Sequence, residues 1–163
     1  MYDQNQYFVG DLFYIAEWFC EKIEYILGYD IFPLPVNGET ALELIENANK
    51  FDSDSELEFD LWYVVKSRWI LNHCWLIARG GSVLPSIFFR RVEDLIEISW
   101  DNTFWKEKDI NFKFQKGVFR IEFSIFVVMI TKFLNSIIFD MKKRISNTTK
   151  IKDLERYIGI LNK

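Results

Sequence analysis

The sequence predicts an α+β fold that is mostly helical, with about five helices packed against a small antiparallel three-stranded sheet. Before residue 80 and after residue 118, apolar residues recur at three- and four-residue spacing, which is typical of amphipathic helices. Between these regions, two β-rich runs lie on either side of Glu93-Asp94, which is typical of a hairpin. Half of the 163 residues are hydrophobic and 18% are aromatic, so we expect residues 1–163 to fill the core of a single domain.

The first expected helix runs from an N-cap at Asp11 to about Leu27, with Gly28 beyond its end. One arc of this helix is apolar and consists of Leu12, Ile15, Ala16, Phe19, Ile23, Ile26 and Leu27. The opposite flank is acidic and aromatic, which core packing alone does not require. We predict that it binds a protein partner through Glu17, Trp18, Glu21, Glu24 and Tyr25, joined by the exposed acids Asp52 and Asp54. The alternative is that these rings cover a neighbouring loop.

Two further helices are expected in the first half of the chain. A short one runs from about Glu39 to Lys50, and a longer one begins at a capping box of Ser55 and Glu58. The longer helix is expected to end at Ala78 or Arg79, before Gly80-Gly81. Its apolar residues surround almost the whole circumference, which predicts a central helix packed on several sides. Arg68 lies in the strongest apolar arc and should therefore meet a carboxylate or reach solvent.

The second half contributes the sheet and two helices. The hairpin strands are expected at 86–92 and 95–100, and a third strand at 110–115, after which Lys116-Gly117 ends the sheet. In the second strand, Ile96, Ile98 and Trp100 alternate with Glu97, Ser99 and Asp101, which predicts one apolar and one solvated face. A long helix is expected from about Phe119 to Arg144, and a last one ends near Leu161. Because Arg120, Glu122 and Lys132 interrupt the apolar tract 119–139, we do not expect it to span a membrane.

The net charge of −4 conceals an opposite charge on the two parts of the chain. Residues 1–60 hold 14 acidic and 2 basic side chains, a net charge of −12, whereas residues 61–163 hold 10 acidic and 18 basic side chains, a net charge of +8. Such an asymmetry either steers a charged partner toward one face or lets the two parts attract each other within one fold. The sequence leaves both alternatives open.

Catalytic and metal-binding patterns are sparse. His73 is the single histidine, and no nucleophile motif accompanies it, so an enzyme centred on His73 is a minor alternative to a partly buried structural histidine. Cys20 and Cys74 lie far apart, so one histidine and two cysteines do not make a zinc site. The acidic run 52–58 lacks the glycine of a calcium loop, although an all-carboxylate magnesium site stays open. We therefore predict no cofactor and no metal.

A second kind of binding site is suggested by basic and aromatic residues near the hairpin. Arginines pair with phosphates and rings stack on bases, so Arg79, Arg90, Arg91 and Trp100 could bind nucleic acid or a nucleotide. This would make the chain a sensor or adaptor module. The competing interpretation is that Arg90 and Arg91 alternate across the sheet and pair with acids of the N-terminal half.

The segment Gly80–Asn102, GGSVLPSIFFRRVEDLIEISWDN, resembles part of some uncharacterised bacterial proteins, several of which carry a peptidase domain of the ImmA/IrrE type. The resemblance transfers no catalytic residue, because this chain has no HExxH motif. The small size and acidic charge are also similar to those of bacterial immunity proteins. The resemblance implies a macromolecule-binding protein, an immunity-type inhibitor that occludes a basic toxin.

The location of the protein can be predicted from its cysteines and its first residues. Two distant cysteines among many apolar residues are typical of reduced core thiols. Residues 1–6 lack the basic start and apolar region of a signal peptide. We therefore expect a cytoplasmic protein, while its oligomeric state does not follow from the sequence.

Overall fold

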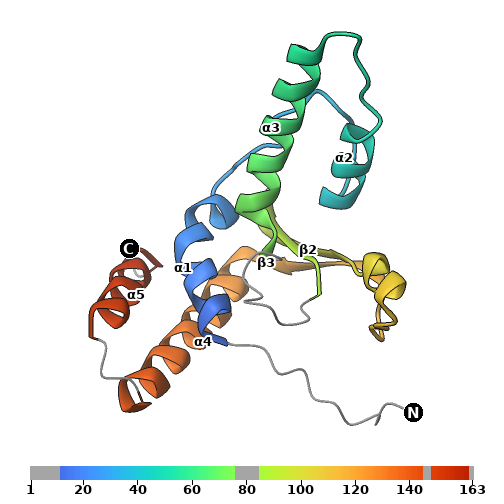
Figure 1. Cartoon of the computed structure of the whole chain (residues 1–163). Helices are drawn as coiled ribbons and strands as arrows, with labels where there is room; N and C mark the ends of the chain where they lie inside the picture. Colours follow the sequence, from blue (N-terminus) through green and yellow to red (C-terminus); the bar gives the residue numbers. More distant parts are fainter. Residues whose placement is uncertain (1–11, 76–84, 145–147, 162–163) are drawn as a thin grey trace.

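The computed structural model describes residues 12–75, 85–144 and 148–161 and has the expected α+β fold, with a small antiparallel sheet among helices (Figure 1). The sheet has the strand order β1-β2-β3. In chain order the elements are α1 (Leu12–Leu27), α2 (Ala41–Ala48), α3 (Glu56–His73), β1 (Ile87–Val92), β2 (Leu95–Asp101), the 3-10 helix η2 (Thr103–Lys108), β3 (Lys116–Glu122), α4 (Phe123–Arg144) and α5 (Thr148–Leu161).

Helix α1 lies at the centre of the main core, where it contacts α3, β1, α4 and α5. Its apolar arc is buried as expected, with Ile23 and Ile26 almost fully enclosed, and the helix ends where Gly28 donates its amide to the carbonyl oxygen of Glu24. The expected cap Asp11 lies outside the described residues. Both cysteines are buried and neither forms a disulfide, and burial raises the pKa of Cys20 to about 12, so this thiol stays protonated.

Helices α2 and α3 pack around a second apolar cluster at one end of the molecule (Figure 1). The prediction that α3 is central is wrong, because only Trp69 and His73 of this helix are buried. Its predicted end near residue 79 is also too late. Cys74 is extended, with φ −113° and ψ 125°, and pairs with Phe88 of β1, which ends the helix at His73. Gly80-Gly81 lies outside the described residues.

The hairpin between β1 and β2 is confirmed, with Val92 opposite Leu95 across a two-residue turn in which Glu93 has a φ of 54°. The third strand is Lys116–Glu122 and not 110–115 as predicted. The pairing explains the difference, because it places Lys116 opposite Asp101 and Arg120 opposite Glu97, two pairs of opposite charge. The predicted start of the long helix at Phe119 is wrong for the same reason: residues 119–122 belong to β3.

Gly117 allows β3 to pass beneath Trp100. The two residues are opposite each other in the sheet, and a Cβ atom at position 117 would lie 2.3 Å from the Trp100 ring. No side chain fits in that space, so only glycine lets the indole cover the strand.

Helix α4 is long and apolar enough to cross a membrane by length and composition, with a mean hydropathy of 1.7 over its most apolar 18-residue window. Two of the three charges on which we based the contrary expectation, Arg120 and Glu122, lie in β3 and not in the helix. Core helices of soluble proteins pass the same test, and one face of α4 is part of the main core through Phe126, Ile130, Leu134, Ile138 and Met141. The absence of a membrane partner stays a prediction.

Candidate protein-binding surface

An exposed acidic strip follows one side of α1. Glu17, Glu21 and Glu24 recur at four- and three-residue spacing, which places them on one side of the helix. Glu21 and Glu24 are exposed, and Glu17 is half-buried. Tyr14 and Tyr25 flank the strip, and each exposes 41% of its surface. We call these five residues the α1 strip; it combines negative charge with two accessible rings.

Trp18 does not belong to this surface, and its predicted role as a partner contact is wrong. The side chain is 3% exposed and packs in the main core, with its ring 5.8 Å from that of Phe89 and 5.1 Å from that of Phe19. The reason is the width of the apolar face of α1. Because α1 contacts the sheet as well as α4 and α5, it buries a wider arc than one neighbour would require.

Asp52 and Asp54 are exposed as predicted, but the structure does not bring them to the α1 strip. They lie in the turn before α3, whereas α3 contacts α1 near its other end, where Lys22 donates to Asn72 with 3.1 Å between the two atoms. The 18 residues of α3 span about 27 Å. The two aspartates therefore belong to a separate surface.

Helix α3 exposes apolar side chains that the sequence analysis placed in the core. Large exposed fractions are found at Leu57 (70%), Leu61 (56%), Tyr63 (58%) and Val64 (51%). A soluble domain rarely exposes apolar groups side by side unless they meet a partner. The missed signal was the spacing of Leu57, Leu61, Val64, Arg68 and Leu71, which alternates four and three residues and so follows one stripe of a helix.

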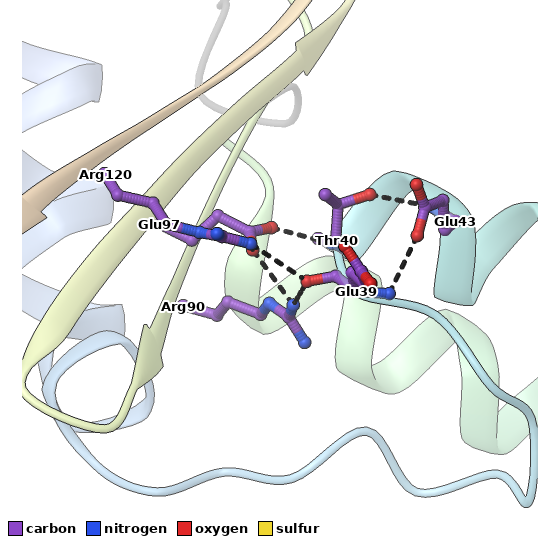
Figure 2. Close-up of polar contacts among 7 residues, drawn as sticks. Glu39, Thr40, Glu43, Arg90, Glu97 and Arg120 are labelled. Carbon is purple, nitrogen blue, oxygen red and sulfur yellow. Dashed lines mark hydrogen bonds and ion pairs between the residues drawn. The ribbon is translucent and has the colours of Figure 1, made fainter.

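A buried carboxylate holds the α2–α3 lobe, the part of the chain formed by α2 and α3, to the sheet at the start of α2 (Figure 2). Glu97 of β2 is fully buried, which corrects the prediction that it lies on a solvated face. One of its oxygens accepts the backbone N–H of Ala41, the first residue of α2, at 2.7 Å. The other accepts from Arg90 at 2.9 Å and lies 3.8 Å from Arg120. The carboxylate thus caps a helix from a distant strand.

The two arginines extend this connection to the backbone before α2. Arg90 and Arg120 both donate to the carbonyl oxygen of Glu39, at 2.7 and 3.3 Å (Figure 2). Locally, Thr40 accepts the N–H of Glu43, and the Glu43 carboxylate accepts the N–H of Glu39. We call Glu97, Arg90, Arg120 and the backbone of residues 39–41 the Glu97 clamp. It fixes where α2, and with it the α2–α3 lobe, sits on the sheet.

The predicted basic site is not assembled as an open surface. Arg90 and Arg91 are consecutive in β1 and point to opposite faces of the sheet. Arg91 lies over the rings of Tyr29 and Phe123 and donates to the carbonyl oxygen of Leu27, so only 19% of its side chain is exposed. Trp100 covers Gly117, and Arg79 lies outside the described residues. Both strand arginines therefore bind acceptors of the protein itself.

His73 is fully buried between α1 and α3. Its Nδ1 is 2.9 Å from the carbonyl oxygen of Trp69, and because a carbonyl only accepts, Nδ1 carries the proton. Its Nε2 lies 3.6 Å from a carboxylate oxygen of Asp30. The ring also stacks on Trp69 with centroids 4.1 Å apart. The His73 ring also lies 6.5 Å from the ring of Tyr25 in α1, so this is the environment of a structural histidine that joins the two helices.

The family of the chain is decided by a family model that matches residues 14–156, a range that includes the α1 strip, α3 and the Glu97 clamp. The chain belongs to DUF5984. This is a family of unknown function. Neither the curated proteins nor the solved structures contain a match to the chain. Membership of DUF5984 supports no link to ImmA/IrrE-type peptidases or to immunity proteins, so both resemblances stay predictions.

Nothing in the described part of this DUF5984 chain gathers metal ligands. Across residues 12–75, 85–144 and 148–161, no group of three or more His, Cys, Asp or Glu side chains could hold an ion. His73, the residue on which an enzymatic alternative depends, is closed to solvent by Trp69 and by the contact of α1 with α3. Two accessible features of this part are the α1 strip and the outer face of α3.

The burial of His73 predicts how stability depends on pH. Burial is the largest cause and lowers the pKa of His73 below its ordinary value of 6.5, against the opposing effects of the Trp69 carbonyl and Asp30. The unfolded chain therefore binds the proton more tightly, so this contribution to stability is complete above pH 6.5 and is lost as the pH falls toward the lower folded pKa. Urea unfolding between pH 7.5 and about 5.5 should show the decline. His73→Asn, which can keep a donor to the Trp69 carbonyl, should remove it; an unchanged slope in that variant would assign the effect elsewhere.

Proposed function

We propose that the protein is an inhibitor of the immunity type, which binds a basic bacterial toxin and occludes its active surface. The observation that carries the proposal is the α1 strip, in which the exposed carboxylates of Glu21 and Glu24 lie beside two accessible tyrosine rings. Charge of one sign speeds the encounter with an oppositely charged partner, and aromatic side chains supply the anchors that hold a complex. All charges of this strip are negative, so it fits a basic surface and not a second copy of itself.

The contacts of Arg90 and Arg91 leave the negative charge of the α1 strip available for a partner. Arg90 and Arg91 do contact that half of the chain, but they bind the backbone carbonyls of Glu39 and Leu27. Their carboxylate contacts are Glu97 and Asp94, which belong to the hairpin itself. These two arginines therefore form no ion pair with the glutamates of the α1 strip. This favours the interpretation that the negative charge steers a partner over the interpretation that it attracts the basic half of the chain.

The test is capture of the partner with a matched pair of charge variants. Glu21→Lys with Glu24→Lys reverses the exposed part of the strip, while Glu46→Lys with Glu107→Lys makes the same change of net charge at exposed positions on α2 and η2. Tagged native chain and both variants are incubated with native cell lysate at low and high salt, and bound proteins are quantified by mass spectrometry. We expect a stoichiometric basic protein with the native chain and the control, and its loss with the strip variant.

Once the partner has been captured, the size of the electrostatic effect is measured as the rate of association between the partner and each variant. Reversal of the two strip glutamates should slow association by about 10-fold or more at low salt, and the difference should shrink as salt rises. The captured protein should also lose its own activity when the native chain is added. Equal capture and equal rates for the strip variant and the control would contradict the proposed surface, and undiminished activity of the captured protein would contradict inhibition.

A further inference from the structure

The outer face of α3 carries a stripe with the spacing of a helix-pairing surface. Leu57, Leu61, Val64, Arg68 and Leu71 are separated by four, three, four and three residues, the spacing that keeps side chains on one seam between paired helices. All five are exposed, and the four apolar members expose between 46% and 70% of their surface. The buried side chains of this helix, Trp69 and His73, point to the opposite side. We call these five residues the α3 seam.

We propose that the α3 seam pairs with the α3 seam of a second copy of the chain, antiparallel, around a two-fold axis at Val64. A two-fold interface needs a surface that is complementary to itself. Val64 is the middle member of the seam, so rotation about it places Leu57 level with Leu71 of the second copy and Leu61 level with its Ser67, one residue before Arg68. Arg68 is the single charged member of the α3 seam. In a paired seam its guanidinium would lie next to apolar side chains, so it needs a carboxylate partner.

Asp60 supplies that carboxylate. It precedes Val64 by four residues and Arg68 follows by four, so the rotation that superposes Val64 on itself brings Asp60 level with Arg68 of the second copy. Within one helix the two residues are about 12 Å apart along the axis, beyond the reach of the i,i+4 pairs that stabilise single helices. Two symmetric Asp60–Arg68 ion pairs therefore form only between copies, beside an apolar centre.

The rest of the molecule also favours the antiparallel direction. The last residues of α3 contact α1, whereas its first residues extend away from α1, α4 and α5 (Figure 1). An antiparallel pair places the two main cores at opposite ends of the helix pair, where they do not meet. A parallel pair would place both at the same end and would set Arg68 against Arg68, a repulsion between like charges in a desolvated layer. Polar residues at such positions fix the direction and register of helix pairs.

The experiment is sedimentation velocity and equilibrium of the full chain, with a charge swap inside the seam. We expect a monomer–dimer equilibrium for the native chain. Arg68→Asp and Asp60→Arg each place like charges level with one another and should raise the dimer Kd by about 10-fold or more. The double variant, Asp60→Arg with Arg68→Asp, exchanges the partners and should restore the native Kd. Glu46→Arg changes the charge as much as Asp60→Arg does, at an exposed position on α2, and should leave the Kd unchanged.

Each outcome decides the proposal. Circular dichroism of every variant first checks that the fold is kept, and because all three positions are exposed we expect it to be. A native chain that stays monomeric at every concentration overturns the proposal. Single variants that dimerise as the native chain does exclude the α3 seam as the interface. Weakened single variants without rescue in the double variant exclude the antiparallel register, since only that register pairs residue 60 with residue 68.

Discussion

Replacement of Glu97 by alanine should lower the free energy of unfolding by about 3–5 kcal/mol, the usual cost of removing one partner of a buried ion pair. Arg90, which is largely buried, would lose its carboxylate, and the N–H of Ala41 at the start of α2 would lose its acceptor. The Ala41 N–H would then be buried without this acceptor, and Arg90 would keep the carbonyl oxygen of Glu39 but lose its counter-charge. The change is measured by urea unfolding followed by circular dichroism, with the slope checked against that of the native chain.

Two variants separate the role of the carboxylate from a general effect of mutating the sheet. Glu122→Ala removes an exposed carboxylate from β3 and should change stability by less than about 0.5 kcal/mol. Glu97→Gln keeps the shape and one acceptor but removes the charge, and should fall between the native chain and Glu97→Ala. If Glu97→Ala is as mild as Glu122→Ala, the clamp does not hold α2 to the sheet.

The role of Glu97 could not have been predicted from its strand. The alternation of Ile96 and Ile98 with Glu97 and Ser99 is typical of a sheet with one solvated face, and that was our prediction. Glu97 and Ser99 are nonetheless fully buried, because the start of α2 covers that face and supplies the donor that Glu97 needs. A covering element some 56 residues earlier in the chain leaves no mark in the local pattern of β2.

Elements whose ends depend on neighbouring residues were predicted well. Elements for which the local sequence suits both a helix and a strand were not. The hairpin at Glu93-Asp94 and the end of α1 at Gly28 depend on neighbouring residues, and both are confirmed. Residues 118–122 suit a helix start or a strand equally well, and the pairing of Arg120 opposite Glu97 decides for the strand. Only that long-range contact distinguishes the two.

The same limit applies to the candidate surfaces. A helical wheel shows which residues share a side of α1 but not how many neighbours cover that side, so Trp18 was expected outside and lies inside. For α3 the error is reversed, because apolar side chains that were expected inside lie outside. Apolar residues all around a helix are typical of a helix that is buried on every side, but also of one that packs on one side and binds a partner on the other. The exposure of Leu57 and Leu61 favours the second case.

Trp69 should be as important for the α2–α3 lobe as Glu97 is for its connection to the sheet. The indole is 3% exposed, stacks on His73 at an interplanar angle of 16°, meets the Phe32 ring edge-on at 4.9 Å and donates to the Asp30 carbonyl at 3.3 Å. Trp69→Ala should therefore lower the free energy of unfolding by about 3–5 kcal/mol, the range for truncating a buried aromatic ring.

Tyr63→Ala is the control for Trp69→Ala, because it removes an exposed ring from the same helix and should change stability by less than about 0.5 kcal/mol. Hydrogen exchange adds the location of the effect. Since Trp69 joins α3 to the segment that follows α1, its loss should release the amides of α2 and α3 first, while those of α4 stay protected. If Trp69→Ala weakens the amide protection of all elements equally, the two apolar clusters unfold as one unit. If Trp69→Ala is as stable as Tyr63→Ala, α3 is held by other contacts.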